Sequence, residues 1–242
     1  MGRAFQDTTA ASVLAAYEAV VGLAISGASS GAGPGGDRAA GPDLDLAAQA
    51  RRMREAFEKR TGAFGPEDPW FEARSRAFWD DALTTQGFAA LAAPHTGDDV
   101  AEVVARFDRA HRGVFLVKDV DDRGAHLLER WSGAELLVRH LDEAQAMTLE
   151  HAEGAMDARV VAGPAAEGGV ASLYLLPGAL HHGPDAVPPL VKVIAAARER
   201  EMATGDALDA LLRMELVLRS SSRVKAGFAY RVESLTRAPP RA

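Results

Sequence analysis

A series of short strand-like segments between residues 113 and 180 restricts the possible folds more than any other feature of the sequence. Five apolar runs, VFLVKDV, AHLLERW, AELLVRHL, DARVVAG and VASLYLLPG, are separated by turn sequences such as DDRG and SG. Runs of this length joined by tight turns are typical of an antiparallel meander. A meander exposes two strand edges unless it closes on itself, so we predict a small barrel of the SH3 or OB type.

Helical periodicity flanks this β segment on both sides. Apolar residues recur three and four positions apart, and cap signals precede two of the helices: Asp68 stands before Pro69, and Thr96 with Asp99 forms a capping box. Helices are predicted at 9–25, at 44–61, from Asp68, from Thr96, at 190–200 and at 206–220, and a last strand is predicted at 227–235. The predicted fold class is α+β, with an N-terminal helical part, a small antiparallel β meander or barrel, and C-terminal helices.

Composition divides the chain into five segments. The stretch GASSGAGPGGDRAAGP is too rich in small and helix-breaking residues to bury a core, so it is predicted to be a flexible linker. The predicted segments are an apolar N-terminal helix at 1–26, the linker at 27–43, a helical domain at 44–112, a small β-barrel at 113–180, and C-terminal helices with a basic tail at 181–242.

Cysteine content and charge exclude several functional classes. There are no cysteines, which excludes disulfides, cysteine nucleophiles, iron–sulfur clusters and zinc ribbons. The formal net charge is −7, but seven Lys or Arg residues against two Glu give the region from Arg213 onward +5, and the remainder carries −12. An acidic body repels the phosphate backbone, so nucleic-acid binding is disfavoured outside the basic tail.

The N-terminal segment TTAASVLAAYEAVVGLAIS bears on localisation. It contains Glu18, and we interpret it as too short and too weakly apolar to span a membrane. Asp7 follows Arg3 closely and the apolar part is interrupted, which argues against a signal peptide. We therefore expect a cytoplasmic protein that does not bind membranes.

The apolar face of this first helix is a candidate partner-binding surface. Val13, Tyr17, Val20 and Val21 contribute to it. Because an apolar helix on a flexible linker needs a surface to cover it, the face is predicted to dock on the chain's own domain or in a groove of a second protein.

The segments FWDDALTTQGF, RGVFLVKDVDDRGAHLLERWSGAELLVRH, MDARVVAG and LYLLPGALHH lie between positions 78 and 182. Together they resemble a recurring pattern of uncharacterised bacterial proteins, in which an aromatic F-W helix precedes a small β unit and a cysteine-rich SEC-C zinc tail often follows. This chain has no cysteine, so the tail and whatever it recruits are not implied. The resemblance implies the architecture and no catalytic residue.

The stretch ALHHGPDAVPP at 179–189 comes closest to an active-site motif. His181, His182 and Asp185 are the candidate metal ligands, in a predicted loop. Adjacent side chains of an extended chain point apart, however, and the spacing lacks the i, i+4 pattern of helical zinc motifs. The prolines and Gly183 also explain the stretch as a connection between a strand and a helix.

No other motif assembles a catalytic group. GAGPGG neither follows a predicted strand nor precedes Lys-Ser/Thr, and there is no G-x-S-x-G nucleophile elbow. The acidic pair Asp80–Asp81 diverges on a helix, and Glu72, Arg76 and Asp80 are spaced as a solvent-exposed ion-pair ladder. No catalytic residue and no cofactor are predicted.

The C-terminal sequence SSRVKAGFAYRVES interleaves basic and aromatic residues, a combination that suits single-stranded nucleic acid. It can equally contact an acidic protein surface, or the acidic 142–157 segment of the same chain. The last contact needs no partner and is preferred. The candidate binding residues are Arg223, Lys225, Phe228, Tyr230 and Arg231.

The absence of an assembled catalytic motif favours a non-catalytic cytosolic protein. We predict that it acts through protein–protein contacts, as an adaptor, scaffold or regulatory binding module that associates with itself or with a protein partner. Binding of RNA or single-stranded nucleic acid through the basic tail is one alternative. A metal-dependent hydrolase that uses the His181–His182 segment is the other.

Overall fold

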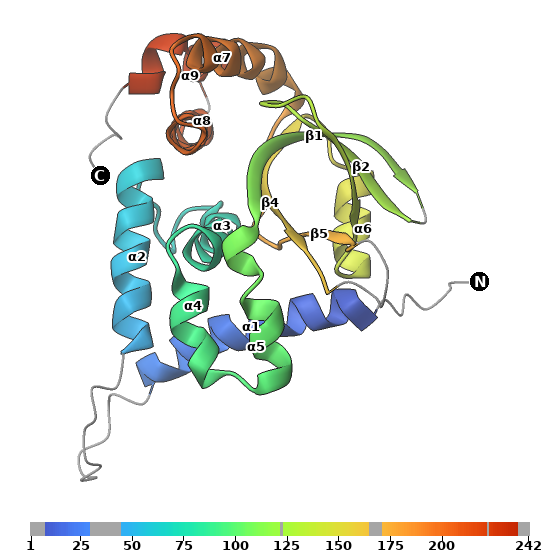
Figure 1. The fold of residues 1–242 in the computed structure, drawn as a ribbon. Helices are drawn as coiled ribbons and strands as arrows, with labels where there is room; N and C mark the ends of the chain where they lie inside the picture. Colours follow the sequence, from blue (N-terminus) through green and yellow to red (C-terminus); the bar gives the residue numbers. More distant parts are fainter. Residues whose placement is uncertain (1–7, 30–44, 122, 165–170, 222, 237–242) are drawn as a thin grey trace.

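The computed structural model describes residues 8–29, 45–121, 123–164, 171–221 and 223–236. Helices lie on two sides of a small barrel (Figure 1), and the predicted α+β class is confirmed. The linker predicted at 27–43 falls outside the described residues from position 30, and residues 27–29 continue the N-terminal helix instead.

The helices and strands have the following bounds. The helices are α1 (Thr8–Ser29), α2 (Leu46–Thr61), α3 (Phe71–Thr84), α4 (Phe88–Ala92), α5 (Asp98–Val104), α6 (Glu143–Glu150), α7 (Val187–Glu199), α8 (Thr204–Arg219) and α9 (Ala226–Ala229), with short 3-10 turns η2 (Ala93–His95), η3 (Phe107–Arg109), η4 (Pro184–Ala186) and η5 (Val232–Thr236). The strands are β1 (His111–Asp121), β2 (Gly124–Glu129), β3 (Glu135–Arg139), β4 (Ala155–Ala162), β5 (Leu173–Leu175) and β6 (Leu180–His182).

Local hydrogen bonds explain where the first helices begin. The Asp45 carboxylate accepts a hydrogen bond from the Ala48 N–H at 2.8 Å and caps α2, and Gly62, with a φ of 99°, ends this helix. The predicted start of the next helix at Asp68 is wrong. The Asp68 side chain accepts from the Gly65 N–H at 2.7 Å, which makes residues 65–68 a turn, and α3 begins at Phe71.

The predicted capping box before α5 is also absent. Thr96 donates its hydroxyl to the Ala93 carbonyl at 2.8 Å, so this side chain closes η2 instead of capping α5. Gly97 occupies the N-cap position, and no side chain caps the helix there.

Five strands close into the barrel. β1 pairs with β2, β2 with β3, β3 with β5, β5 with β4, and β4 with β1. The β3–β5 pair is parallel and α6 lies in the crossover between β3 and β4, so the unit is not the purely antiparallel meander that the sequence predicted. This five-stranded Greek-key order is that of an OB-type barrel.

Three segments differ from the sequence-based expectation. Residues 143–150 form α6, which was not predicted and which Asp142 caps by accepting from the Gln145 N–H at 2.7 Å. The segment predicted as a last strand forms α9 and η5, because Ala226, Ala229 and Tyr230 recur at helical spacing and are buried. His181 and His182 lie in strand β6, paired with β4, and not in a loop.

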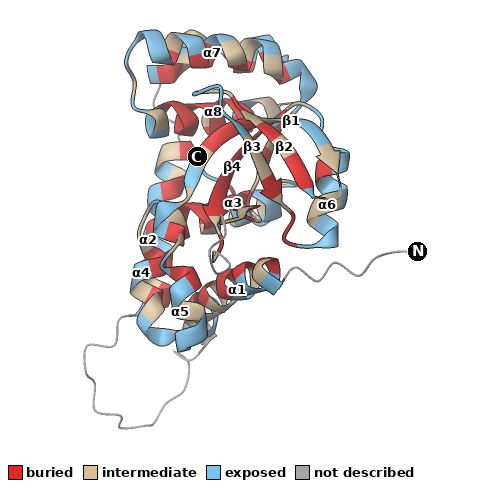
Figure 2. Ribbon diagram, turned by 45° about the vertical axis from the view of Figure 1, so that its right-hand side comes forward, coloured by how far each residue is buried: buried red, intermediate tan, exposed pale blue. Residues whose placement is uncertain are grey.

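The apolar core consists of three clusters, and each of them contains residues from both the helices and the strands. One cluster joins α1–α4 to barrel residues such as Val161 and Tyr174, a second fills the barrel interior, and a third lies between β1 and α7–α9. In Figure 2, buried residues run along β4 and through part of β1, and they recur in the helices around the barrel. The helices therefore share their core with the barrel.

α1 packs against α2 and α5. Its Thr8–Ser26 segment has a mean hydropathy of 1.6 and is long and apolar enough to cross a membrane by length and composition, contrary to our interpretation of the sequence. Val13 and Val20 are fully buried in the helical cluster and Tyr17 is nearly so. These contacts cover one face of the helix, and 33% of the segment is buried.

Candidate functional site

The two adjacent histidines face opposite sides of β6. His182 is fully buried, and its Nδ1 lies 2.6 Å from the Tyr230 hydroxyl. His181 is partly exposed, and its carbonyl accepts a hydrogen bond from Arg219 at 3.1 Å. Burial lowers the pKa of both imidazoles, which keeps them neutral at physiological pH.

The candidate metal ligands are not brought together. Asp185 lies exposed in η4, one turn beyond the strand, while the two imidazoles point apart as strand geometry requires. No group of three or more His, Asp or Glu side chains is placed to hold a metal ion in the part of the chain that the structure describes.

The predicted partner-binding residues of α1 are engaged within the chain itself. Val13, Tyr17 and Val20 are buried, and Val21 packs partly buried against the same cluster. The sequence left open whether this helix docks on its own domain or on a partner. In this structure it docks on its own domain.

The basic tail is split between interior and surface. Tyr230 is 3% exposed and packs on the α7–α8 cluster, whereas Phe228 is 63% exposed. The Arg231 guanidinium lies 4.6 Å from the centre of the Phe228 ring, which is cation–π geometry. Arg223 and Lys225 are exposed beside them.

The barrel face that OB proteins use for oligonucleotides, on β2 and β3, lacks the usual stacking residues. The barrel aromatics Phe115 and Tyr174 are buried, and Trp131 packs against the α7–α8 cluster. The hollow on this face is lined by mixed charges and leucines, including Lys118, Asp119 and Glu135. This face therefore does not resemble a nucleic-acid platform.

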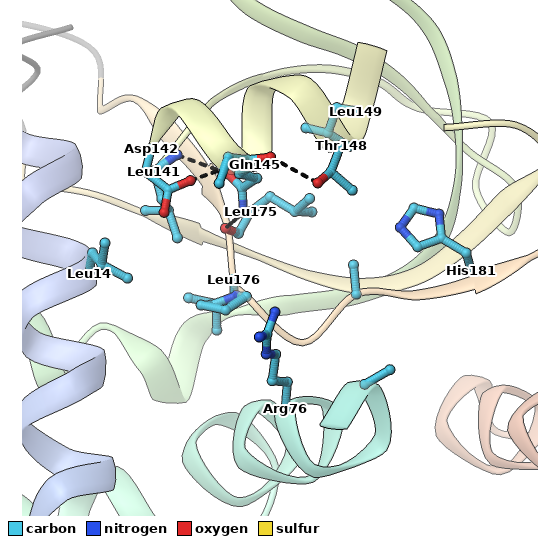
Figure 3. Close-up of a pocket in the computed structure, with 14 residues that line it drawn as sticks. Leu14, Arg76, Leu141, Asp142, Gln145, Thr148, Leu149, Leu175, Leu176 and His181 are labelled. Carbon is cyan, nitrogen blue, oxygen red and sulfur yellow. Dashed lines mark hydrogen bonds between the residues drawn. The ribbon is translucent and has the colours of Figure 1, made fainter. Parts of the chain in front are cut away.

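A cleft of about 260 Å³ lies between α1, α3, α6 and the β5–β6 connection. Figure 3 shows Leu14 entering it from α1, Arg76 from α3 and His181 from β6, with α6 forming the opposite wall. Most of the lining is apolar, with Leu141, Leu175 and Leu176 among the deeper residues.

The α6 wall of the cleft is held in place by hydrogen bonds from one side chain. The Gln145 amide oxygen accepts from the Leu141 N–H at 2.9 Å, and its nitrogen donates to the Leu175 carbonyl at 2.9 Å. Opposite, Gly178 packs directly on α3, because a Cβ there would approach the Arg76 carbonyl to 2.5 Å. The cleft is thus preformed on two sides.

The edge of the cleft next to α6 carries one exposed apolar side chain and two carboxylates. Met147 is 57% exposed, and the segment around it carries no Lys or Arg. The single arginine in the lining, Arg76, is already 4.0 Å from Glu72 on the same helix. Asp142 lines the cleft, and Met147 and Glu153 line an adjoining hollow that shares Thr148 and His181 with it. We call the exposed Asp142 and Glu153 the acidic rim.

A buried ion-pair network, which the sequence analysis did not find, joins the helices to the barrel. Its three arginines and three aspartates come from α2, α3, α8, β1 and β4 and balance in charge. Arg60 pairs with Asp81 at 2.5 Å and Asp209 at 2.7 Å, Arg112 with Asp157 at 2.9 Å and Asp209 at 2.6 Å, and Arg159 with Asp81 at 2.7 Å. None of the six lines the cleft, so the network is structural.

Neighbouring aspartates on α3 experience opposite environments. Asp80, predicted to be exposed on a charge ladder, is fully buried, and burial raises its pKa to about 7 against the opposing effect of Arg159. It accepts a hydrogen bond from the Gly178 N–H at 3.0 Å. Burial would also raise the pKa of Asp81, but Arg159 and Arg60 hold it below its usual value.

A sequence signal for the network exists in β4. Asp157 and Arg159 are two residues apart in the run DARVVAG, so they lie on one face of an otherwise apolar strand. Charges in that position require partners, although the sequence does not identify Asp81 and Arg112 as those partners.

Comparisons of the chain with protein-family models, with curated proteins and with solved structures gave no match. The resemblance to proteins with a SEC-C tail therefore stays a prediction, and function has to be argued from the cleft, the tail and their charges.

Proposed function

We propose that this chain is a non-catalytic cytosolic module that binds a basic, partly apolar segment of a protein in the cleft between α1, α3 and α6. The observation that carries the proposal is an apolar cleft lined by leucines, with Asp142 at its edge and with exposed Met147 and Glu153 in the adjoining hollow. Apolar contacts supply affinity in such a groove, and rim charges select the partner by sign.

The size of the cleft favours a protein segment over a small molecule. At about 260 Å³ it falls below the roughly 300–1,000 Å³ of typical ligand pockets. It has room for one or two side chains that project from a larger surface. An exposed methionine at the rim suits this role, because its flexible thioether adapts to different apolar partners.

The two alternatives have weaker support. Phe228 is the one large aromatic side chain that is well exposed in the described ranges, and a nucleic-acid platform needs several. A hydrolase would need His181, His182 and Asp185 to converge, and their side chains diverge.

Binding of synthetic helical peptides tests the proposal. We expect a Leu/Lys peptide to bind full-length protein in fluorescence polarisation, and a Leu/Glu peptide of equal length not to bind. Ala144 is exposed and lines the cleft, so Ala144→Trp fills the cleft and should weaken binding at least tenfold. Ala90→Trp, at an exposed alanine of α4 outside the cleft, is the matched control.

Equal binding of both peptides, or an Ala144→Trp variant that binds as well as Ala90→Trp, would contradict the proposal. In either case the cleft would not be the binding surface.

A further inference from the structure

The exposed part of the tail forms a second surface, of opposite charge to the cleft rim. We call Arg223, Lys225, Phe228 and Arg231 the tail patch. Phe228 projects with Arg231 stacked on its ring, while the buried Ala226, Ala229 and Tyr230 fix α9 on α8 and η4. The patch therefore presents one aromatic ring surrounded by three positive charges on a fixed support.

The tail patch does not neutralise the acidic segment of its own chain. α9 packs against α8 and η4, and in the described part of the chain no ion pair joins Arg223, Lys225 or Arg231 to a carboxylate. The preferred sequence-based expectation, a tail bound to residues 142–157 in the same chain, is not met. Both surfaces stay exposed to solvent with opposite charges.

Both surfaces border the same short stretch of backbone. His181 of β6 lines the cleft, and its carbonyl is held by Arg219 at the end of α8, where the chain turns toward the tail. The next residue, His182, contacts Tyr230 of the tail. Two complementary surfaces that meet at one strand can share a single two-fold interface, in which each copy supplies both halves.

We propose that the occupant of the cleft is the tail patch of a second copy of this chain. The Phe228 ring enters the apolar cleft beside Met147, and the three basic side chains of the patch face the acidic rim. The contact is reciprocal and forms a symmetric dimer that weakens as salt is added, because its charges are at the surface. This inference rests on the proposed function of the cleft.

Reciprocal charge reversal, read out by sedimentation velocity on full-length protein, tests the pairing. The rim variant is Asp142→Asn with Glu153→Lys, in which asparagine keeps the cap of α6, and the tail variant is Arg223→Glu with Arg231→Glu. All four side chains are exposed, so both variants should fold. We expect each alone to dimerise at least tenfold more weakly, and an equimolar mixture, or all four changes in one chain, to restore the dimer.

An apolar substitution tests the part played by the ring. Phe228→Ala should weaken dimerisation at least tenfold, whereas Ile25→Ala, at another apolar side chain of similar exposure, should leave it unchanged.

A wild-type protein that stays monomeric in low salt overturns the inference, as does a dimer that both charge reversals leave intact. If the monomer still binds the Leu/Lys peptide, the proposed function stands and only the identity of the occupant is wrong. If a monomer binds a single-stranded oligonucleotide and the tail variant does not, the tail patch serves nucleic acid and not a second copy.

Discussion

The buried network and the pair of surface patches contain the same residue types, but they differ in whether each charge has a partner. Within the network, Arg112 and Arg159 each lie against carboxylates at 2.6–2.9 Å and are almost entirely removed from water. On the surface, the tail patch and the acidic rim are exposed, and no ion pair involves them among the residues that the structure describes. Burial thus distinguishes the charged residues that stabilise the fold from the charged residues that are free to contact a partner.

The difference follows from the cost of desolvation. A buried charge without a counterion loses several kcal/mol of hydration, so every member of the network depends on the others. An exposed charge loses almost nothing when its partner is absent. Network substitutions should therefore change stability, and surface substitutions should change association.

The largest effect is expected for Asp81→Asn. Arg159 is 1% exposed, and within the described ranges it forms an ion pair with Asp81 alone, so this change leaves a buried guanidinium uncompensated. We expect a loss of about 3–5 kcal/mol in the free energy of unfolding, measured by urea denaturation with tryptophan fluorescence. Adding Arg159→Met should recover part of this loss. A loss of unfolding free energy below about 1 kcal/mol would mean that water reaches the Arg159 guanidinium, contrary to the burial described.

Asp80→Asn, one residue away, should have the opposite sign. Folding raises the Asp80 pKa from 3.8 to about 7, so ionisation destabilises the folded state progressively as pH rises through that window. Asparagine cannot ionise, and we expect the variant to gain on the order of 4 kcal/mol at pH 8 and less than about 1 kcal/mol at pH 4. The difference between variant and wild type isolates Asp80 from the histidines. A difference independent of pH would contradict this assignment.

Tyr230→Phe should cost less unfolding free energy than Asp81→Asn, because it removes a hydrogen bond between two neutral buried groups and leaves no charge without a partner. The His182 Nδ1 loses its hydrogen-bond partner while the ring packing on α8 is kept. We expect a loss of about 1–2 kcal/mol in thermal or urea unfolding. Phe228→Leu, in the exposed part of the same tail, is the control and should leave stability unchanged.

The smallest effect on stability should come from the rim itself. Asp142→Asn with Glu153→Lys, which we expect to weaken dimerisation at least tenfold, should shift the unfolding free energy of the monomer by less than about 0.5 kcal/mol. The measurement is urea denaturation at a protein concentration where wild type is monomeric. A loss of unfolding free energy as large as that of Asp81→Asn would contradict the view that network charges stabilise the fold and rim charges do not.

The spacing of apolar residues correctly predicted the helices and strands that bury one uninterrupted apolar face. The α2 stripe of Leu46, Ala50, Met53 and Phe57 is buried as its spacing predicted, and each of the five predicted strand segments overlaps one of β1 to β5. The strand predicted at 227–235 was wrong because GFAYRVESL fits both strand and helical periodicity over so short a length. The segment forms α9 and η5, which pack against α8.

The candidate site was less predictable, because it depends on residues distant in the chain. Nothing local marks Leu14, Arg76 and Leu175 as walls of one cleft, and Asp81 lies far in sequence from Arg159. The tail could be singled out because its basic and aromatic residues lie close together in the sequence. Four of its candidate binding residues, Arg223, Lys225, Phe228 and Arg231, are exposed, whereas Tyr230 is buried against His182, a tertiary contact that the sequence does not reveal.

The order of the network along the chain has a consequence for synthesis. Asp209 lies in α8, whereas its partners Arg60 and Arg112 come much earlier in the chain. Once the barrel has been synthesised, each of these arginines already has one carboxylate, Asp81 or Asp157. The carboxylate that bridges the two arginines is supplied only when α8 leaves the exit tunnel, so the helical part and the barrel cannot complete their shared ion pairs before that point.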